Sequence, residues 1–261
     1  MPEIRIDPLS GQKTIIAGER SLRPGGEPCC APPEPIDPAN DPFAEGHEDR
    51  TPPEIYAVRA AGGPPDSPGW TVRVIPNLYP ALAPATRSEA TAPDPEGGAW
   101  PDLFASAPAT GAHEVIVNGP QPVLSLAELP VEQVVAALEV WRERMRAHAD
   151  CACVQLIVNE RREAGASLPH THAQLYALDF VPAAVARERE RFGAYATRMM
   201  GQCLLEDLVA AEVRRRERIV AIDDEAVLMA PYGSRLPFHL MLAPRRPRAR
   251  FEEDGATGAA L

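Results

Sequence analysis

The hydrophobic residues of this chain occur in short runs separated by long segments rich in proline and glycine. Apolar runs with the length and composition of strands are found at residues 13–17, 54–58, 71–75 and 114–117. Many of the 30 prolines lie in the segments 23–53, 62–69 and 83–108. Because proline lacks a backbone donor and has a fixed φ, these segments are predicted to be loops and extended connections.

A longer periodic pattern predicts a helix from about residue 130 to residue 148. Pro130 suits a first helical turn, and apolar residues return every three or four positions, at Val131, Val134, Val135, Leu138, Trp141 and Met145. A second helical region, 183 to about 218, carries Arg/Glu pairs at helical spacing, as is typical of a solvated helix face. Further strands are predicted at 154–158, 219–230 and 238–243. Several connections are too short for crossover helices, so the chain is predicted to be an α+β protein with mostly antiparallel strands flanked by helices.

One predicted strand has polar side chains where a buried strand would have apolar ones. The stretch from Ser167 to Tyr176 reads SLPHTHAQLY, and side chains alternate in a strand, so His170, His172 and Gln174 are expected on one face. By itself such a pair of histidines fits a structural role, a metal site or a catalytic site. The preceding Gly165 and the Ser167 hydroxyl favour catalysis, because together with an amide they suit phosphate oxygens around a nucleophilic imidazole.

Composition and charge narrow the classes of function. The net charge of -11 argues against nucleic acid and anionic membranes as partners. Five cysteines without a CxxC pair argue against a disulfide framework and a zinc ribbon. With 261 residues, the chain has no charged leader and no apolar run near the roughly 18 residues of a membrane span. We therefore expect a cytoplasmic protein.

The segment around the histidines resembles a known family. Residues 159–182, NERREAGASLPHTHAQLYALDFVP, are similar to the active-site segment of galactose-1-phosphate uridylyltransferase and its nucleotide-sugar phosphorylase relatives, in the histidine-triad superfamily. Further blocks match in the same order at 5–24, 49–58, 72–82, 113–117 and 230–246. The resemblance implies a histidine-triad-like catalytic domain at 1–182 and an incomplete second domain of similar kind at 183–261, apparently truncated.

The resemblance also implies a reaction and a set of site residues. It implies transfer of a UMP group from a UDP-hexose to a hexose 1-phosphate, with His172 as the nucleophile that becomes covalently nucleotidylated. Gln174 matches a glutamine that hydrogen-bonds the phosphoryl oxygens, and His170 matches a residue that orients the nucleophile. Substrate-binding positions are implied for Arg20, Arg23, Asn77, Asn159, Gly165 and Ser167. Without the resemblance, the arginines would be surface residues and Asn77 a turn residue. The remaining histidines are predicted to be structural or exposed, namely His47, His113, His148 and His239.

The family's usual zinc ligands are mostly missing. Where relatives have two cysteines and a histidine, this chain has Asp41, Ala44 and Pro122, so that only His170 remains. One nitrogen ligand cannot hold a tetrahedral zinc, and we predict none there. A rebuilt site with Asp41 and His47 is the alternative.

Several alternatives stay open at this point. The same histidine would serve a nucleotide-sugar phosphorylase or a hydrolase, and a non-catalytic nucleotide-binding descendant is a further reading. The implied partners are a nucleotide sugar and a sugar 1-phosphate, without nucleic acid or membrane, and a homodimer is compatible with the resemblance. The nucleobase, the sugar and the acceptor are not readable from the residues.

Overall fold

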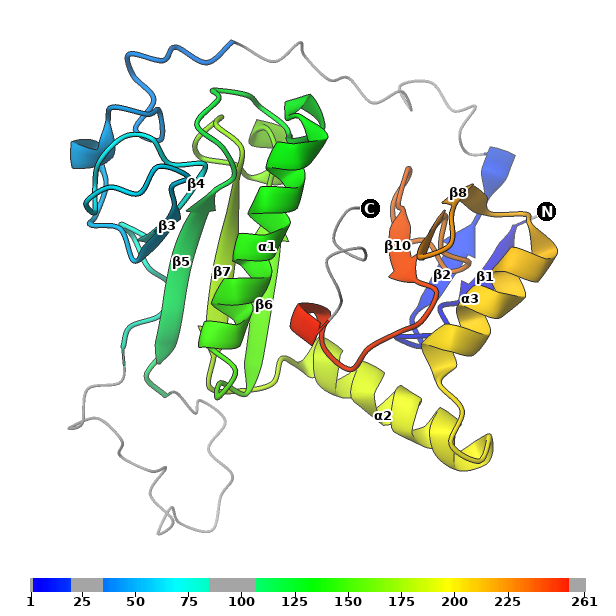
Figure 1. Ribbon diagram of the computed structural model, residues 1–261. Coiled ribbons are helices and arrows are strands. Elements are labelled where there is room, and N and C mark those ends of the chain that lie inside the picture. Colours follow the sequence, from blue (N-terminus) through cyan, green and yellow to red (C-terminus); the bar gives the residue numbers. More distant parts are fainter. Residues whose placement is uncertain (1, 20–34, 85–106, 254–261) are drawn as a thin grey trace, which may run out of the picture. The chain divides into compact units, whose positions relative to one another are not determined.

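The computed structural model describes residues 2–19, 35–84 and 107–253 (Figure 1). The chain divides into two compact units, Pro33–Phe180 and Met1–Pro32 together with Val181–Leu261. Both contain helices and antiparallel strands, so the predicted α+β class is confirmed. None of the described helices is both long enough and apolar enough to cross a membrane.

The unit Pro33–Phe180 is built on a five-stranded antiparallel sheet with the strand order β3-β4-β5-β7-β6. Its strands are β3 (Tyr56–Val58), β4 (Val72–Pro76), β5 (Gly111–Val117), β6 (Cys153–Val158) and β7 (His172–Leu178). The helix α1 (Val131–Ala147) lies across one face of this sheet (Figure 1), and the predicted helix 130–148 is thereby confirmed. Short 3-10 helices occupy Glu48–Arg50, Leu126–Glu128 and Arg162–Ala164.

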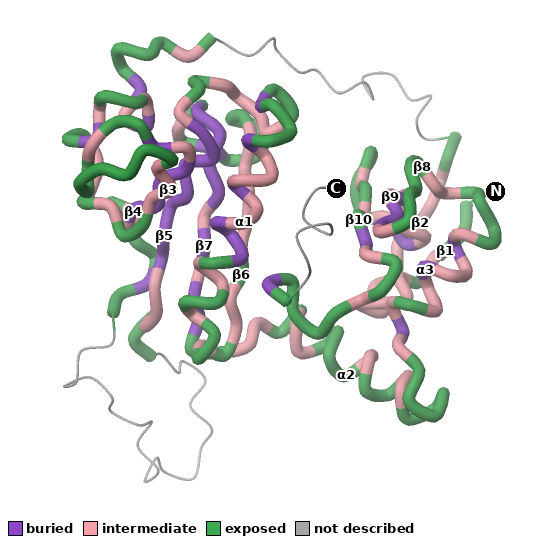
Figure 2. The backbone as a smooth tube through the Cα atoms, in the orientation of Figure 1, coloured by how far each residue is buried: buried purple, intermediate pink, exposed green. Residues whose placement is uncertain are grey.

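Alternation along the strands gives the sheet two apolar faces. Towards α1, a core of strand residues and helix residues is buried, comprising Val72, Val74, Ile116, Ala137, Val140, Trp141, Ala173, Leu175 and Ala177. On the opposite face, Ile75, Val115 and Val117 pack with Phe43 and Trp70 from the loops. Figure 2 shows the consequence, a continuous buried zone along the central strands. The second face carries the candidate site.

The pairing of the two central strands depends on a glycine. Gly111 has φ +142°, and a Cβ atom at this position would overlap the backbone carbonyl oxygen of Ala177 in β7. From there the antiparallel register runs to Val117 opposite His172. Gly111 therefore permits the close approach that sets which β5 side chains face the histidine strand.

The second unit contains both the N-terminal and the C-terminal segments of the chain. The hairpin of β1 (Glu3–Ile6) and β2 (Lys13–Ile16) belongs to it, with the helices α2 (Ala183–Arg198) and α3 (Leu204–Arg215). A three-stranded sheet of order β10-β9-β8 completes it, formed by β8 (Ile219–Ile222), β9 (Ala226–Met229) and β10 (Met241–Pro244), and Phe251–Glu253 is a 3-10 helix. Its small core contains Val209, Val227, Met229 and Ala243.

Two features of this unit differ from the expectation. The helical region 183–218 is two helices, because the chain turns through left-handed conformations at Met200 and Gly201. The division of the chain near Phe180 lies close to the expected domain boundary at 182, but the first 32 residues group with the C-terminal segment. The N-terminal hairpin contacts the C-terminal segment directly, since the Thr14 hydroxyl donates to the carbonyl oxygen of Gly233, 219 positions away.

Candidate active site

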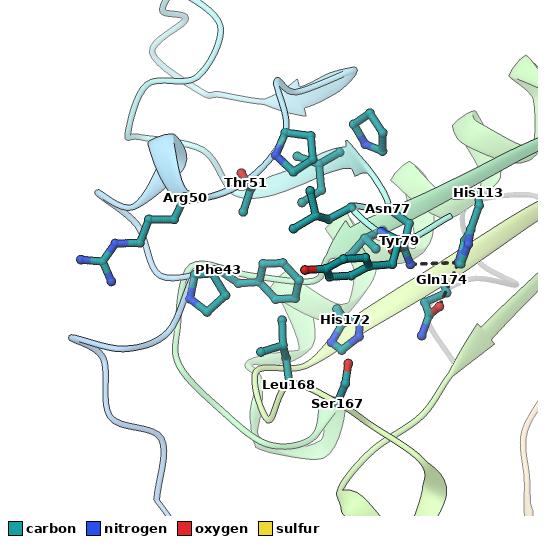
Figure 3. Close-up of a pocket in the computed structure, with 16 residues that line it drawn as sticks. Phe43, Arg50, Thr51, Asn77, Tyr79, His113, Ser167, Leu168, His172 and Gln174 are labelled. Carbon is teal, nitrogen blue, oxygen red and sulfur yellow. Dashed lines mark hydrogen bonds between the residues drawn. The ribbon is translucent and has the colours of Figure 1, made fainter. Parts of the chain in front are cut away.

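A cavity of about 450 Å³ opens on the sheet face opposite α1. It is lined by Pro42, Phe43, Arg50, Thr51, Pro52, Ile75, Pro76, Asn77, Leu78, Tyr79, His113, Val115, Ser167, Leu168, His172 and Gln174. Figure 3 shows His172, Gln174 and Ser167 gathered on one side of it, with Arg50 and Thr51 towards the other. The cavity thus joins a polar end with a largely apolar wall, which suits a ligand that has both a charged and a planar apolar part.

The polar end follows from strand alternation and register. His172 and Gln174 lie two positions apart on β7 and both line the cavity, as predicted for residues sharing a face. Their partners across the ladder on β5 are Val117 and Val115. His113, two positions further along β5, also lines the cavity.

His170 is not part of the cavity lining, although its ring contacts Phe43, as the ring of His172 does. The strand β7 begins at His172, so His170 precedes it, and its side chain is fully buried outside the cavity lining. Its Nδ1 lies 2.6 Å from Oδ2 of Asp41, and its Nε2 lies 2.8 Å from the carbonyl oxygen of Gly119. The ring is therefore engaged by oxygen atoms on both sides.

The backbone of His170 nevertheless contacts His172. The Nδ1–H of His172 donates to the carbonyl oxygen of His170 over 2.7 Å. This assigns the proton to Nδ1 and leaves Nε2 with a lone pair. Burial lowers the pKa of His172, outweighing the opposing effect of the hydrogen bond to His170. The ring is thus held neutral, in one tautomer, at the edge of a cavity.

The position of the His172 ring is set by its neighbours. Phe43 packs edge-on against it, with the ring centroids 5.3 Å apart. The N–H of Thr171 donates to the carbonyl oxygen of Val123, and the Thr171 side chain accepts from buried Asn118. The segment before β7 is therefore tied to the loop after β5, and this fixes where the strand begins.

Gln174 belongs to a hydrogen-bonded group that sequence reasoning missed. Its Oε1 accepts from the Tyr176 hydroxyl at 3.0 Å and lies 2.9 Å from Nε2 of His113. Nδ1 of His113 accepts from the N–H of Ala81 at 3.1 Å. His113 was expected to be structural or exposed, and it is instead a buried residue of the cavity wall. Its place in an apolar strand was visible in the sequence, but the strand it would pair with was not.

The other predicted site residues fall into three groups. Asn77 and Ser167 line the cavity. Asn159 and Gly165 are outside its lining, and Gly165, with φ 90°, provides the left-handed residue that ends a 3-10 turn. Arg20 and Arg23 lie outside the described residues. Sequence reasoning also missed the apolar wall, whose members carry no chemical signature, such as Pro42, Phe43, Ile75, Leu78 and Leu168.

The residues at the family's zinc position do not fit a zinc ion. His170 has both ring nitrogens facing oxygen atoms, and its partner Asp41 also accepts from the N–H of Phe43 at 3.0 Å. Ala44 and Pro122 offer no ligand side chain. In the described part of the chain, no group of three or more His, Cys, Asp or Glu side chains is arranged to hold a metal. The absence of zinc from the purified protein stays a prediction.

Fold and site define an α+β protein whose antiparallel sheet carries a neutral, buried histidine beside a ligand-sized cavity. The family described as galactose-1-phosphate uridyl transferase, N-terminal domain, matches residues 64–182. ADP-glucose phosphorylase of Arabidopsis thaliana is 27% identical over 254 residues, 96% of this chain and 68% of that protein. Galactose-1-phosphate uridylyltransferase of Cryptococcus neoformans is 29% identical over 254 residues, 92% of this chain and 62% of that protein.

Solved structures show the same fold. The crystal structure of ADP-glucose phosphorylase from Arabidopsis thaliana with bound ADP-glucose matches with a TM-score of 0.77 at 24% identity, over 100% of this chain and 73% of that one. A uridylyltransferase structure matches with a TM-score of 0.67 at 25% identity, over 100% of this chain and 71% of that one. The chain is therefore similar both to galactose-1-phosphate uridylyltransferases and to ADP-glucose phosphorylase, and the family model matches its residues 64–182. It spans between 62% and 68% of the length of the two curated relatives described above.

Proposed function

We propose that this protein is a nucleotidyltransferase that moves a UMP group from a UDP-hexose to a hexose 1-phosphate through a covalent intermediate on His172. One observation carries the proposal: the hydrogen bond from Nδ1 of His172 to the carbonyl oxygen of His170 leaves the Nε2 lone pair available on a ring that lines the cavity. A neutral imidazole held in one tautomer is the form of histidine that attacks phosphorus.

In the first step, Nε2 of His172 attacks the α-phosphorus of the nucleotide sugar. The N–P bond forms while the bond from phosphorus to the bridging oxygen breaks, and the sugar 1-phosphate leaves with that electron pair. The imidazole then carries a positive charge, which the carbonyl oxygen of His170 stabilises through the Nδ1–H that faces it at 2.7 Å. In the second step a phosphate oxygen of the incoming sugar 1-phosphate attacks the same phosphorus, and the N–P bond breaks to restore the neutral ring.

The cavity offers a site for each part of such a substrate. Gln174 and Ser167 supply donors beside His172, where the phosphoryl oxygens would lie. The apolar wall that includes Phe43 and Ile75 suits the flat face of a nucleobase. Asn77 lines the same cavity, and its amide is available to a ribose hydroxyl. Arginine contacts to the nucleotide from Arg20 and Arg23, implied by the family resemblance, remain part of the proposal.

A second candidate is a nucleotide-sugar phosphorylase, in which inorganic phosphate takes the nucleotidyl group from the same histidine. The similarity to ADP-glucose phosphorylase of Arabidopsis thaliana, which extends over 96% of this chain, favours this alternative. The two reactions share the first step and differ in the acceptor. Product analysis with sugar 1-phosphate, phosphate or water as acceptor, and with UDP-glucose or ADP-glucose as donor, separates them.

The covalent step is tested by trapping. Incubation with UDP-glucose or ADP-glucose labelled at the α-phosphate, without acceptor, is expected to leave acid-labile label on the protein. His172→Asn is expected to abolish labelling and transfer while leaving the circular dichroism spectrum unchanged. His239→Asn makes the same chemical change in the other unit and should label normally. Label retained by the His172 variant refutes the nucleophile, and no label on the wild-type protein from either donor refutes the covalent mechanism.

A further inference from the structure

The side chains of His113, Gln174 and Tyr176 meet because of the register between β5 and β7. His113 lies directly opposite Tyr176, and Val115 lies opposite Gln174. Residues opposite each other share a face of the sheet, so His113 and Tyr176 come together beside Gln174. The two rings stack, with centroids 4.1 Å apart and an interplanar angle of 26°. Gln174 lines the cavity next to His172.

The surroundings of the His113 ring select one tautomer. Its Nδ1 accepts the N–H of Ala81 at 3.1 Å, so the neutral ring carries its proton on Nε2. That nitrogen lies 2.9 Å from Oε1 of Gln174, to which it donates. The Nδ2 of Asn77 lies 3.1 Å away but cannot donate to a protonated nitrogen. The opposite tautomer would direct a ring N–H at the N–H of Ala81.

The Asn77 amide does not favour the other tautomer of His113. Its Oδ1 accepts the N–H of Tyr79 at 2.8 Å, which keeps the Asn77 oxygen away from the ring. Gln174 then receives two donors on one oxygen, from Nε2–H of His113 and from the Tyr176 hydroxyl at 3.0 Å. Rotating the Gln174 amide by half a turn would bring its NH₂ group against the Nε2–H of His113, and the Tyr176 hydroxyl would have to turn from donor to acceptor. The Oε1 atom is therefore held towards His113, and the NH₂ group is left for the cavity.

We propose that His113 is a positioning residue for nucleotidyl transfer, which acts together with Tyr176 to fix the Gln174 amide so that its NH₂ group faces the phosphoryl oxygens. This inference rests on the proposed function, since it concerns the same phosphorus centre beside His172. An amide free to rotate would present its oxygen to the phosphate about as readily as its nitrogen, and two oxygens facing each other repel. A donor fixed in advance stabilises the negative charge of the transition state without a reorganisation cost.

Two substitutions separate the hydrogen bond from the stacking. His113→Phe keeps a ring against Tyr176 and removes the donor, and we expect kcat to fall about 10- to 100-fold. His113→Gln loses the aromatic stack but can still direct an N–H at Gln174, and it should recover at least about half of that loss on a logarithmic scale. Tyr176→Phe removes the second donor and should cost about fivefold. His239→Phe in the other unit is the control and should leave kcat unchanged.

A double-mutant cycle tests whether His113 acts through Gln174. In a Gln174→Ala background, His113→Phe should reduce kcat by less than about twofold, because there is no amide left to orient. Losses that multiply in the double variant overturn the proposal, and so does a His113→Phe protein with wild-type kcat.

Two measurements are independent of turnover and distinguish this inference from the proposed function. Long-range ¹H–¹⁵N spectra of histidine-labelled protein should show the Nε2–H tautomer for His113, identified by the signal that His113→Phe loses. The Nδ1–H tautomer refutes the orientation. In calorimetry with UDP and ADP, His113→Phe should bind the preferred nucleotide about tenfold more weakly than the wild-type protein does. Adding His113→Phe to the Gln174→Ala variant should cause no further loss of affinity. If the wild-type protein fails to transfer nucleotide, the proposed function is refuted. The tautomer of His113, and the coupling of His113→Phe with Gln174→Ala in nucleotide affinity, still test the role of His113.

Discussion

Replacing Asp41 by asparagine removes the carboxylate that faces the buried ring of His170. The two side chains are almost completely shielded from solvent, at 1% and 0% exposure, and Oδ2 of Asp41 lies 2.6 Å from Nδ1 of His170. The other ring nitrogen lies 2.8 Å from the carbonyl oxygen of Gly119. Both ring nitrogens thus face oxygen atoms, and Asp41 is the hydrogen-bond partner of Nδ1.

The expected loss of stability in Asp41→Asn follows from counting the hydrogen-bond donors and acceptors around the side chain. The carboxylate serves two donors, Nδ1–H of His170 and the N–H of Phe43 at 3.0 Å. An asparagine has one oxygen for both and turns its NH₂ group towards the other. A charge-assisted hydrogen bond is lost and a buried donor is left without an acceptor, so Asp41→Asn should lower the free energy of unfolding by about 3 to 5 kcal/mol.

Urea denaturation followed by tryptophan fluorescence measures this loss. The three tryptophans, Trp70, Trp100 and Trp141, all lie within Pro33–Phe180, so the signal reports that unit alone. Asp37→Asn is the matched control, since Asp37 is an exposed side chain of the same loop, and it should cost less than about 0.5 kcal/mol.

The pairing is tested by combining the changes. His170→Asn added to Asp41→Asn should show a coupling energy of about 2 kcal/mol, because the first change has already removed the interaction. The reasoning is refuted by a loss below about 1 kcal/mol for Asp41→Asn, or by losses that simply add.

Three further predictions concern the same unit. Because burial lowers the pKa of His172 below the usual 6.5 and the neutral ring is the nucleophile, the acid limb of the labelling rate should be centred below pH 6.5; an acid limb centred above this value contradicts it. Burial by itself would raise the pKa of Glu114, but hydrogen bonds from Arg144 and His148 together outweigh burial, and the pKa lies below its usual value. Glu114→Gln should therefore cost about 3 kcal/mol near pH 7. That stabilisation is present above the unfolded pKa of about 4.3 and lost as the pH falls through the folded value, so equal urea midpoint shifts at pH 7 and pH 3 argue against the ion pair. Gly111→Ala, whose Cβ meets the Ala177 carbonyl, should destabilise the protein by at least about 2 kcal/mol in thermal unfolding, whereas Gly193→Ala, in open space on α2, should not destabilise it.

The local pattern of apolar and polar residues was enough to predict most of the secondary-structure elements and part of the candidate site. Apolar spacing predicted a helix at 130–148, close to the observed Val131–Ala147, since packing against one sheet face selects every third or fourth side chain. It missed β1, whose four residues pair with those of β2. It also merged α2 and α3, because nothing in the helical spacing reveals the left-handed turn at Met200 and Gly201.

For the site, the alternation of a strand placed His172 and Gln174 on one face, and the amino-acid sequence alone determined this much. Only tertiary structure decided the role of His170, whose ring partner Asp41 lies 129 positions away. It also decided that His113 stands beside Gln174, because the pairing of β5 with β7 joins residues 61 positions apart. Alternation is a property of neighbouring bonds, whereas hydrogen-bond partners, tautomers and burial depend on segments that meet only when the chain has folded.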